Sequence, residues 1–109
     1  MEKVIEEILA FSKERDWEQF HTEENLAKSI AIEAGELLEC FQWSSDYDKA
    51  HVCEELADVM NYCILMADRL GVDIKDILRD KNEKNKQKYP VELAKGNAAK
   101  YTELKKAGK

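Results

Sequence analysis

The sequence has few of the residues that interrupt helices. Its 109 residues include four glycines and one proline, the two residue types that are least compatible with a helix interior. No stretch of alternating polar and apolar residues indicates a β-strand. The three cysteines, Cys40, Cys53 and Cys63, form no CxxC pair, and their odd number argues against a disulfide framework or a cysteine zinc site. We therefore expect an all-α protein with small buried thiols.

Long hydrophobic segments are also lacking. The longest nearly apolar run, VMNYCILMA at residues 59–67, is far too short to span a bilayer. The first residues, MEKVIEEILAF, interleave acidic with apolar side chains and contain no signal-peptide core. We expect a cytoplasmic protein without a membrane partner. The length fits one domain over residues 1–109.

Charge is unevenly distributed along the chain. The formal net charge is −6, but residues 1–78 hold 7 basic and 19 acidic side chains, while residues 79–109 hold 10 basic and 4 acidic ones. The acidic part is a poor binder of nucleic-acid polymers, whose affinity comes largely from neutralised phosphates. The basic part is either a solvated helix face or a site for a small phosphorylated ligand.

Helical periodicity divides the chain into four main helices and a short C-terminal helical segment. Thr22, Asp48 and Asp73 are suitable N-caps, Gly71 suits a helix C-terminus, and Pro90 ends the fourth helix. The expected helices cover residues 2–15, 23–42, 49–70 and 74–88, and the short segment lies within residues 91–106. The loop at residues 44–48 is short, so the second and third helices can pack antiparallel.

Glu33 lies among apolar residues on the second expected helix. At about 100° per residue, Ile30 and Leu37 lie within about 40° of Leu26 around the helix axis, and Glu33 lies about 20° from Leu26. A carboxylate on a packed face is costly unless another group compensates it. Glu33 therefore needs a partner that helical periodicity alone does not identify.

Two carboxylate pairs occur at i, i+3 spacing. Glu33 with Glu36, and Glu55 with Asp58, each share one helix face, and antiparallel helices bring the pairs together. Four neighbouring carboxylates repel one another unless cations hold them. The ligands are hard oxygens and no histidine is spaced to join them, so Mg²⁺ or Mn²⁺ fits better than zinc. Each pair alone is also compatible with a solvated acidic face.

These motifs resemble a known family. EAGE followed by EELAD is similar to the ExxE and ExxD signature of the MazG-type all-α nucleoside triphosphate pyrophosphohydrolases. The stretches ERDWEQFHTEENLAKSIAIEAGELLECFQW, EELADVMNY and KNEKNKQKYPVELAKGNAAKYTEL resemble the dCTP pyrophosphatase branch of that family. The resemblance extends over roughly residues 5–104. The interval between the second and third helices is shorter than in animal members of the branch.

The resemblance implies a MazG-like helical bundle that hydrolyses nucleotides between the α and β phosphates, giving a monophosphate and pyrophosphate. It places Mg²⁺ and catalysis on Glu33, Glu36, Glu55 and Asp58. The implied substrates are dCTP and modified dCTP, and the implied assembly is a homotetramer made of two dimers. A broader-specificity pyrophosphohydrolase is an alternative, and so is a non-catalytic helical module that binds a basic partner or divalent ions.

The same resemblance suggests residues that contact the substrate. The candidates for the base pocket are Trp17, Phe20, His21 and Trp43. The positions that match phosphate or sugar contacts are Tyr62, Lys81, Asn85, Lys88 and Tyr89. Without the resemblance, the aromatic residues indicate core packing with a hydrogen-bonded histidine, and the lysines indicate a solvated surface.

Overall fold

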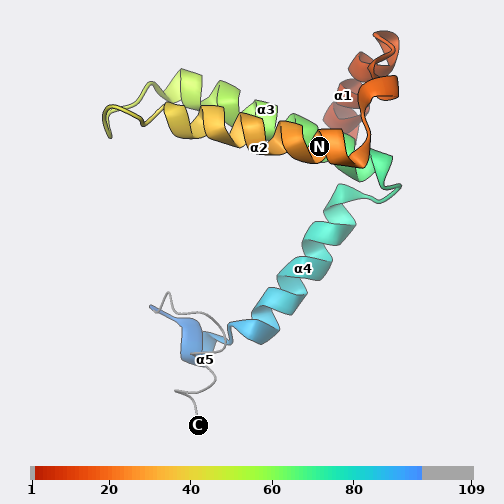
Figure 1. Cartoon of the computed structure of the whole chain (residues 1–109). Helices are drawn as coiled ribbons and strands as arrows, with labels where there is room; N and C mark the ends of the chain where they lie inside the picture. Colours follow the sequence, from red (N-terminus) through yellow and green to blue (C-terminus); the bar gives the residue numbers. More distant parts are fainter. Residues whose placement is uncertain (1, 97–109) are drawn as a thin grey trace. The chain divides into compact units, whose positions relative to one another are not determined.

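The computed structural model describes residues 2–96, and these residues are helical apart from short connections (Figure 1). The elements are α1 (Glu2–Glu14), the 3₁₀ helix η1 (Trp17–Phe20), α2 (Glu23–Glu39), α3 (Lys49–Arg69), α4 (Ile74–Lys88) and α5 (Val91–Ala94). No β-strand occurs between residues 2 and 96, so the all-α prediction is confirmed. The expected helical segment after residue 96 lies outside the described residues.

Side-chain caps set the start of the two central helices. The backbone N–H of Asn25 donates to Thr22 Oγ1 at 3.1 Å, at the start of α2. The backbone N–H of Ala50 donates to Asp48 Oδ1 at 3.1 Å, at the start of α3. The predicted N-caps Thr22 and Asp48 are confirmed, since each side chain satisfies an N–H group that the helix itself leaves without an acceptor. The N-cap role of Asp73 stays a prediction.

The predicted end of α2 at residue 42 is wrong by three residues. The N–H groups of Cys40, Phe41 and Gln42 donate to carbonyl oxygens three residues earlier instead of four. Such bonds tighten the end of a helix and lead the chain out of it. The helix therefore ends at Glu39, and residues 40–48 connect it to α3.

The segment between α1 and α2 is held in one tight conformation. Asp16 adopts a φ of 56°, in the left-handed region, which aspartate tolerates better than most residues. The side-chain amide of Asn25 donates to the carbonyl oxygen of Phe20 at 3.0 Å. Ser12, which is buried, and His21 share a hydrogen bond between Oγ and Nδ1 at 3.4 Å. These contacts place Trp17 and His21 beside α1.

Within residues 2–73, α2 and α3 lie side by side and α1 lies against α3 (Figure 1). An ion pair between Arg69 Nε and Glu23 Oε1, 2.9 Å apart, joins the end of α3 to the start of α2, so the two helices are antiparallel. Among residues 2–96, the buried apolar side chains are only Leu26, Ile64 and Ala67. A single chain therefore has a small core.

The cysteines are free, as expected, but they are not all buried. Cys53 is exposed, while Cys40 and Cys63 are partly covered. The expectation of three buried thiols was wrong for Cys53, because nothing within the described part of the chain covers that side of α3.

The chain divides into two compact units between Asp73 and Ile74. The second unit begins with α4, which ends before Pro90 as predicted, and continues with the short helix α5. The single domain over residues 1–109 remains a prediction. No helix among residues 2–96 is long and apolar enough to cross a membrane.

Candidate functional site

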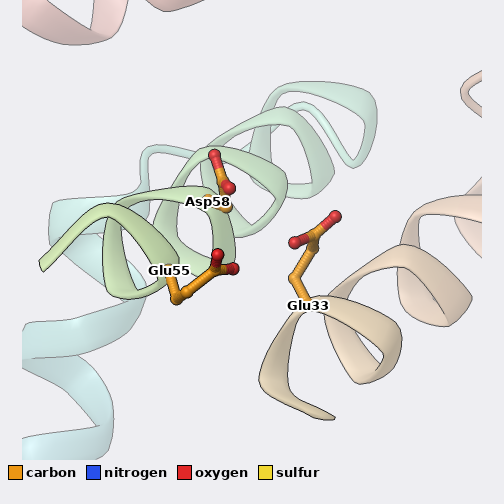
Figure 2. Close-up of side chains that lie close together, drawn as sticks. All are labelled: Glu33, Glu55 and Asp58. Carbon is orange, nitrogen blue, oxygen red and sulfur yellow. The ribbon is translucent and has the colours of Figure 1, made fainter. Parts of the chain in front are cut away.

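Three carboxylates converge between α2 and α3. Glu33 extends from α2 toward Glu55 and Asp58 on α3 (Figure 2). One carboxylate oxygen from each residue lies within 4.8 Å of the other two. We call these three residues the acidic cluster. Its geometry follows from the antiparallel packing, which brings the middle of α2 next to the first half of α3.

Two oxygens of the acidic cluster have no compensating partner in the described structure. Glu33 Oε2 and Glu55 Oε2 are buried and make no hydrogen bond with the described residues. The pKa of Glu33 is raised above the usual glutamate value of 4.5, first because burial removes water and then because Glu36, Asp58 and Glu55 carry like charges. A divalent cation with a preference for oxygen ligands would compensate both effects. The residues present therefore fit such an ion.

Glu36 lies close to the acidic cluster but not within it. Its side chain is exposed, and it does not belong to the group of three converging carboxylates. Its charge nevertheless acts on Glu33, as the raised pKa of Glu33 shows. The structure thus brings together three of the four predicted metal ligands, and the role of Glu36 as a fourth ligand stays a prediction.

Sequence reasoning missed one neighbour of the acidic cluster. His51 Nε2 lies 3.2 Å from Glu55 Oε1, and His51 Nδ1 lies 3.9 Å from Cys40 Sγ. Histidine was considered from the sequence only as a metal ligand, so this contact with Glu55 was not identified, and His51 is not one of the three converging residues. The i, i+4 spacing of His51 and Glu55, which places two side chains on one helix face, was a signal that could have identified the contact.

A cavity of about 470 Å³ opens beside the acidic cluster. It lies among residues of α1, η1 and α3, and Asp58 belongs both to its lining and to the cluster. Its volume is within the usual range for small-molecule sites. The lining consists of Val4, Glu7, Ile8, Phe11, Ser12, Trp17, His21, Asp58, Asn61, Tyr62 and Leu65.

Only two of the four predicted base-pocket residues line the cavity. Trp17 and His21 line it, and so does Tyr62, one turn beyond Asp58 on α3. Phe20 and Trp43 do not line it, and they are 61% and 90% exposed. Their roles as base contacts stay predictions. The apolar residues of α1 were missed, because the repeating pattern of an amphipathic helix does not distinguish a helix that lines a cavity from one that packs on a core.

Apart from Tyr62, the predicted phosphate and sugar contacts belong to the second unit. Lys81, Asn85 and Lys88 lie on α4, and Tyr89 follows it. The pKa of Lys81 is lowered, chiefly because the ammonium group of Lys88 lies near it. Two neighbouring ammonium groups make a local positive charge suited to an anion. The contacts of these four residues with a substrate remain predictions.

The fold and the site define an all-α protein with an acidic cluster suited to a divalent metal. The MazG-like family matches residues 28–104 of this chain. This match spans more than half of the chain and includes all three residues of the acidic cluster. The chain belongs to the MazG-like family, which confirms the resemblance inferred from the ExxE and ExxD motifs.

Individual relatives agree with this assignment. The chain is 43% identical to dCTP pyrophosphatase 1 of Mus musculus and 40% identical to that of Homo sapiens, in each case over 86% of this chain. It spans 61% of the length of these two relatives. A solved structure, a pyrophosphatase from Archaeoglobus fulgidus, matches with a TM-score of 0.75 and 38% identity. That match covers 83% of this chain and 92% of the archaeal chain.

Proposed function

We propose that this chain is a Mg²⁺-dependent nucleoside triphosphate pyrophosphohydrolase that acts on dCTP and modified dCTP in the cytoplasm. The observation that carries the proposal is the acidic cluster, with two buried oxygens that lack partners, at the edge of an apolar cavity. The names of similar proteins support it, since they include dCTP pyrophosphatase 1 and a pyrophosphatase.

The carboxylates of Glu33, Glu55 and Asp58, with Glu36 beside them, would hold the metal. A bound Mg²⁺ would neutralise triphosphate charge and help to activate the attacking water. The chain itself supplies a carboxylate environment in which the pKa of Glu33 is already raised. Glu33 Oε2 and Glu55 Oε2 are buried without a hydrogen-bond partner among the described residues, so these two oxygens are available for a cation.

The cavity would hold the nucleobase. Trp17 packs edge-on against Phe11, with their ring centroids 5.6 Å apart, so the indole has a supported position from which to contact a flat base. Stacking tolerates every base, and selection for cytosine therefore requires hydrogen bonds to its polar edge. His21 is the candidate, because its bond to the buried Ser12 orients the imidazole at the cavity wall.

The position of Asp58 indicates how the substrate would be oriented in the site. Since this residue belongs to both the cavity and the acidic cluster, a base in the cavity leaves the phosphates next to the metal ligands. Tyr62 lines the cavity one helical turn beyond Asp58 and would contact the sugar. On the strength of the family resemblance alone, we also propose Lys81, Asn85, Lys88 and Tyr89 as phosphate or sugar contacts.

The proposal is tested by mixing the purified protein with Mg²⁺ and equal concentrations of the four deoxynucleoside triphosphates. We expect dCTP to be consumed first, with deoxycytidine monophosphate and pyrophosphate as the products. Release of orthophosphate and a nucleoside diphosphate would contradict cleavage between the α and β phosphates. Equal consumption of all four nucleotides would favour the broader-specificity alternative, and metal binding without turnover would favour the non-catalytic one.

Exposed apolar side chains predict self-association. Leu38 and Ile32 on α2, and Leu56 and Met60 on α3, are exposed in the single chain, and few side chains of residues 2–96 are fully buried. Apolar surface of this kind marks an interaction site. We expect a homotetramer, with a dimer as the alternative, in multi-angle light scattering at micromolar concentration. A stable mass near 12.6 kDa would contradict this prediction.

A further inference from the structure

His51 contacts a residue of the acidic cluster without belonging to the cluster. It lies one helical turn before Glu55 on α3, and its Nε2 atom is 3.2 Å from Glu55 Oε1. The Glu55 side chain is 14% exposed and that of His51 is 55% exposed. The carboxylate of Glu55 is therefore largely enclosed, and His51 contacts it from a more exposed position on the same helix.

The contact divides the two oxygens of Glu55 between two functions. Oε1 accepts the bond from His51, while Oε2 is buried and has no partner among the described residues. A single hydrogen bond to one oxygen limits rotation of the carboxylate about its last torsion. It thereby keeps the second oxygen available for a cation.

The neighbours of His51 indicate which ring nitrogen carries the proton. An ionised carboxylate only accepts hydrogen bonds, so Nε2 is the donor to Glu55. Nδ1 lies 3.9 Å from Cys40 Sγ, and this sulfur also lies 3.7 Å from the carbonyl oxygen of Glu36. Cys40 directly follows α2, so His51 connects the two helices that carry the carboxylates.

From this geometry we propose that His51 is a positioning residue that orients Glu55 for binding a divalent metal. The inference rests on the proposed function, because it concerns the same metal. Residues that hydrogen-bond to metal ligands orient them, and their loss weakens metal affinity by about 10- to 100-fold. An ordinary exposed i, i+4 pair, by comparison, stabilises its helix by only a few tenths of a kcal/mol.

The experiment compares three substitutions of His51 by isothermal titration of Mg²⁺ in the absence of nucleotide. His51→Gln retains a donor close to the position of Nε2, whereas His51→Asn offers one closer to Nδ1 and His51→Ala offers none. We expect His51→Ala and His51→Asn to weaken affinity by about 10-fold or more, and His51→Gln to restore most of it. Lys28→Ala is the control, because Lys28 forms an exposed i, i+4 pair with Glu24 on α2. The Mg²⁺ affinity of this variant should equal that of the unaltered protein.

The outcomes separate the two hypotheses. The positioning role is overturned if all three His51 variants bind Mg²⁺ as tightly as the unaltered protein, or if His51→Ala binds it more tightly. Either result leaves the proposed function intact. Absence of Mg²⁺ binding by the unaltered protein overturns the proposed metal site itself, and the positioning role with it. Circular dichroism checks that each variant is helical. Should His51→Ala fail to fold, the comparison of His51→Gln with His51→Asn decides, since equal weakening in these two variants contradicts the proposal.

Discussion

Glu33→Gln should reduce turnover by about 10³-fold or more while raising the melting temperature of the metal-free protein. A 10³-fold loss corresponds to about 4 kcal/mol of transition-state stabilisation, which is within the range supplied by a catalytic metal ion. Stability changes in the opposite direction, because glutamine removes a buried like charge from beside Glu55 and Asp58. A residue that only supported the fold would lose activity and stability together.

The stabilisation of the metal-free protein by Glu33→Gln should depend on pH, because the pKa of Glu33 is raised. The folded protein holds this proton more tightly than the unfolded chain does, so the metal-free protein loses stability as the pH rises. This loss of stability is absent at a pH below 4.5, the pKa of glutamate in the unfolded chain, and is complete at a pH above the raised pKa of Glu33 in the folded protein. The stabilisation of Glu33→Gln over the unaltered protein should therefore be largest near neutral pH and shrink as the pH falls toward 4.5.

Thermal melts with and without Mg²⁺ provide the measurement, together with a pyrophosphate-release assay. Mg²⁺ should raise the melting temperature of the unaltered protein by binding its folded form and should have little effect on Glu33→Gln. Glu39→Gln is the matched control, because Glu39 is an exposed glutamate on the same helix outside the acidic cluster. Full activity in Glu33→Gln would show that Glu33 is not a metal ligand. A metal-free Glu33→Gln variant that melts at a lower temperature than the metal-free unaltered protein would show that the Glu33 charge does not destabilise the fold.

Trp17→Ala should raise the KM for dCTP by about one to two orders of magnitude, since stacking on an aromatic side chain contributes about 1–3 kcal/mol per base. The metal ligands are untouched, so Mg²⁺ affinity should not change. Phe20→Ala is the control from the same 3₁₀ helix, because Phe20 is exposed and does not line the cavity. If the cavity alone forms the base site, the KM of Phe20→Ala should remain that of the unaltered protein, and the predicted role of Phe20 as a base contact would then be wrong.

Steady-state kinetics with dCTP and titration of Mg²⁺ test this prediction on the same preparations. Trp17→Phe should give an intermediate KM, since a smaller ring retains part of the stacking surface. The cavity would not be the base site if Trp17→Ala and Phe20→Ala had equal effects on KM. A loss of Mg²⁺ affinity in Trp17→Ala would show instead that the substitution disturbs the packing of α1 and α3.

The MazG-like family match includes only some of the residues on which these predictions rest. Residues 28–104 match the MazG-like family, and this range contains the acidic cluster but not Trp17 or His21. The metal ligands therefore lie in the part of the chain that carries the family match. The cavity, in contrast, also depends on residues of α1 and η1, which precede the matched range.

Local sequence determined the helices and the inward position of Glu33. Thr22 and Asp48 cap α2 and α3 because each side chain reaches an N–H group two or three residues away. Gly71 adopts a φ of 71° after α3, a conformation that glycine allows at little cost. The ExxE and ExxD spacing placed each carboxylate pair on one helix face. All of these features depend on neighbours within about two helical turns, so a single sequence was sufficient to predict them.

Only the tertiary structure decided which groups meet across helices. Packing of α1 against α3 formed the cavity, and it brought Trp17 and His21 to its wall while leaving Phe20 outside. The antiparallel pairing of α2 and α3 selected Glu33, Glu55 and Asp58 from the many acidic residues and left Glu36 at the periphery. These contacts join residues that are far apart in the chain, and they depend on side-chain shape and helix rotation. Helical periodicity specifies which face of a helix is apolar, but not the element that covers that face.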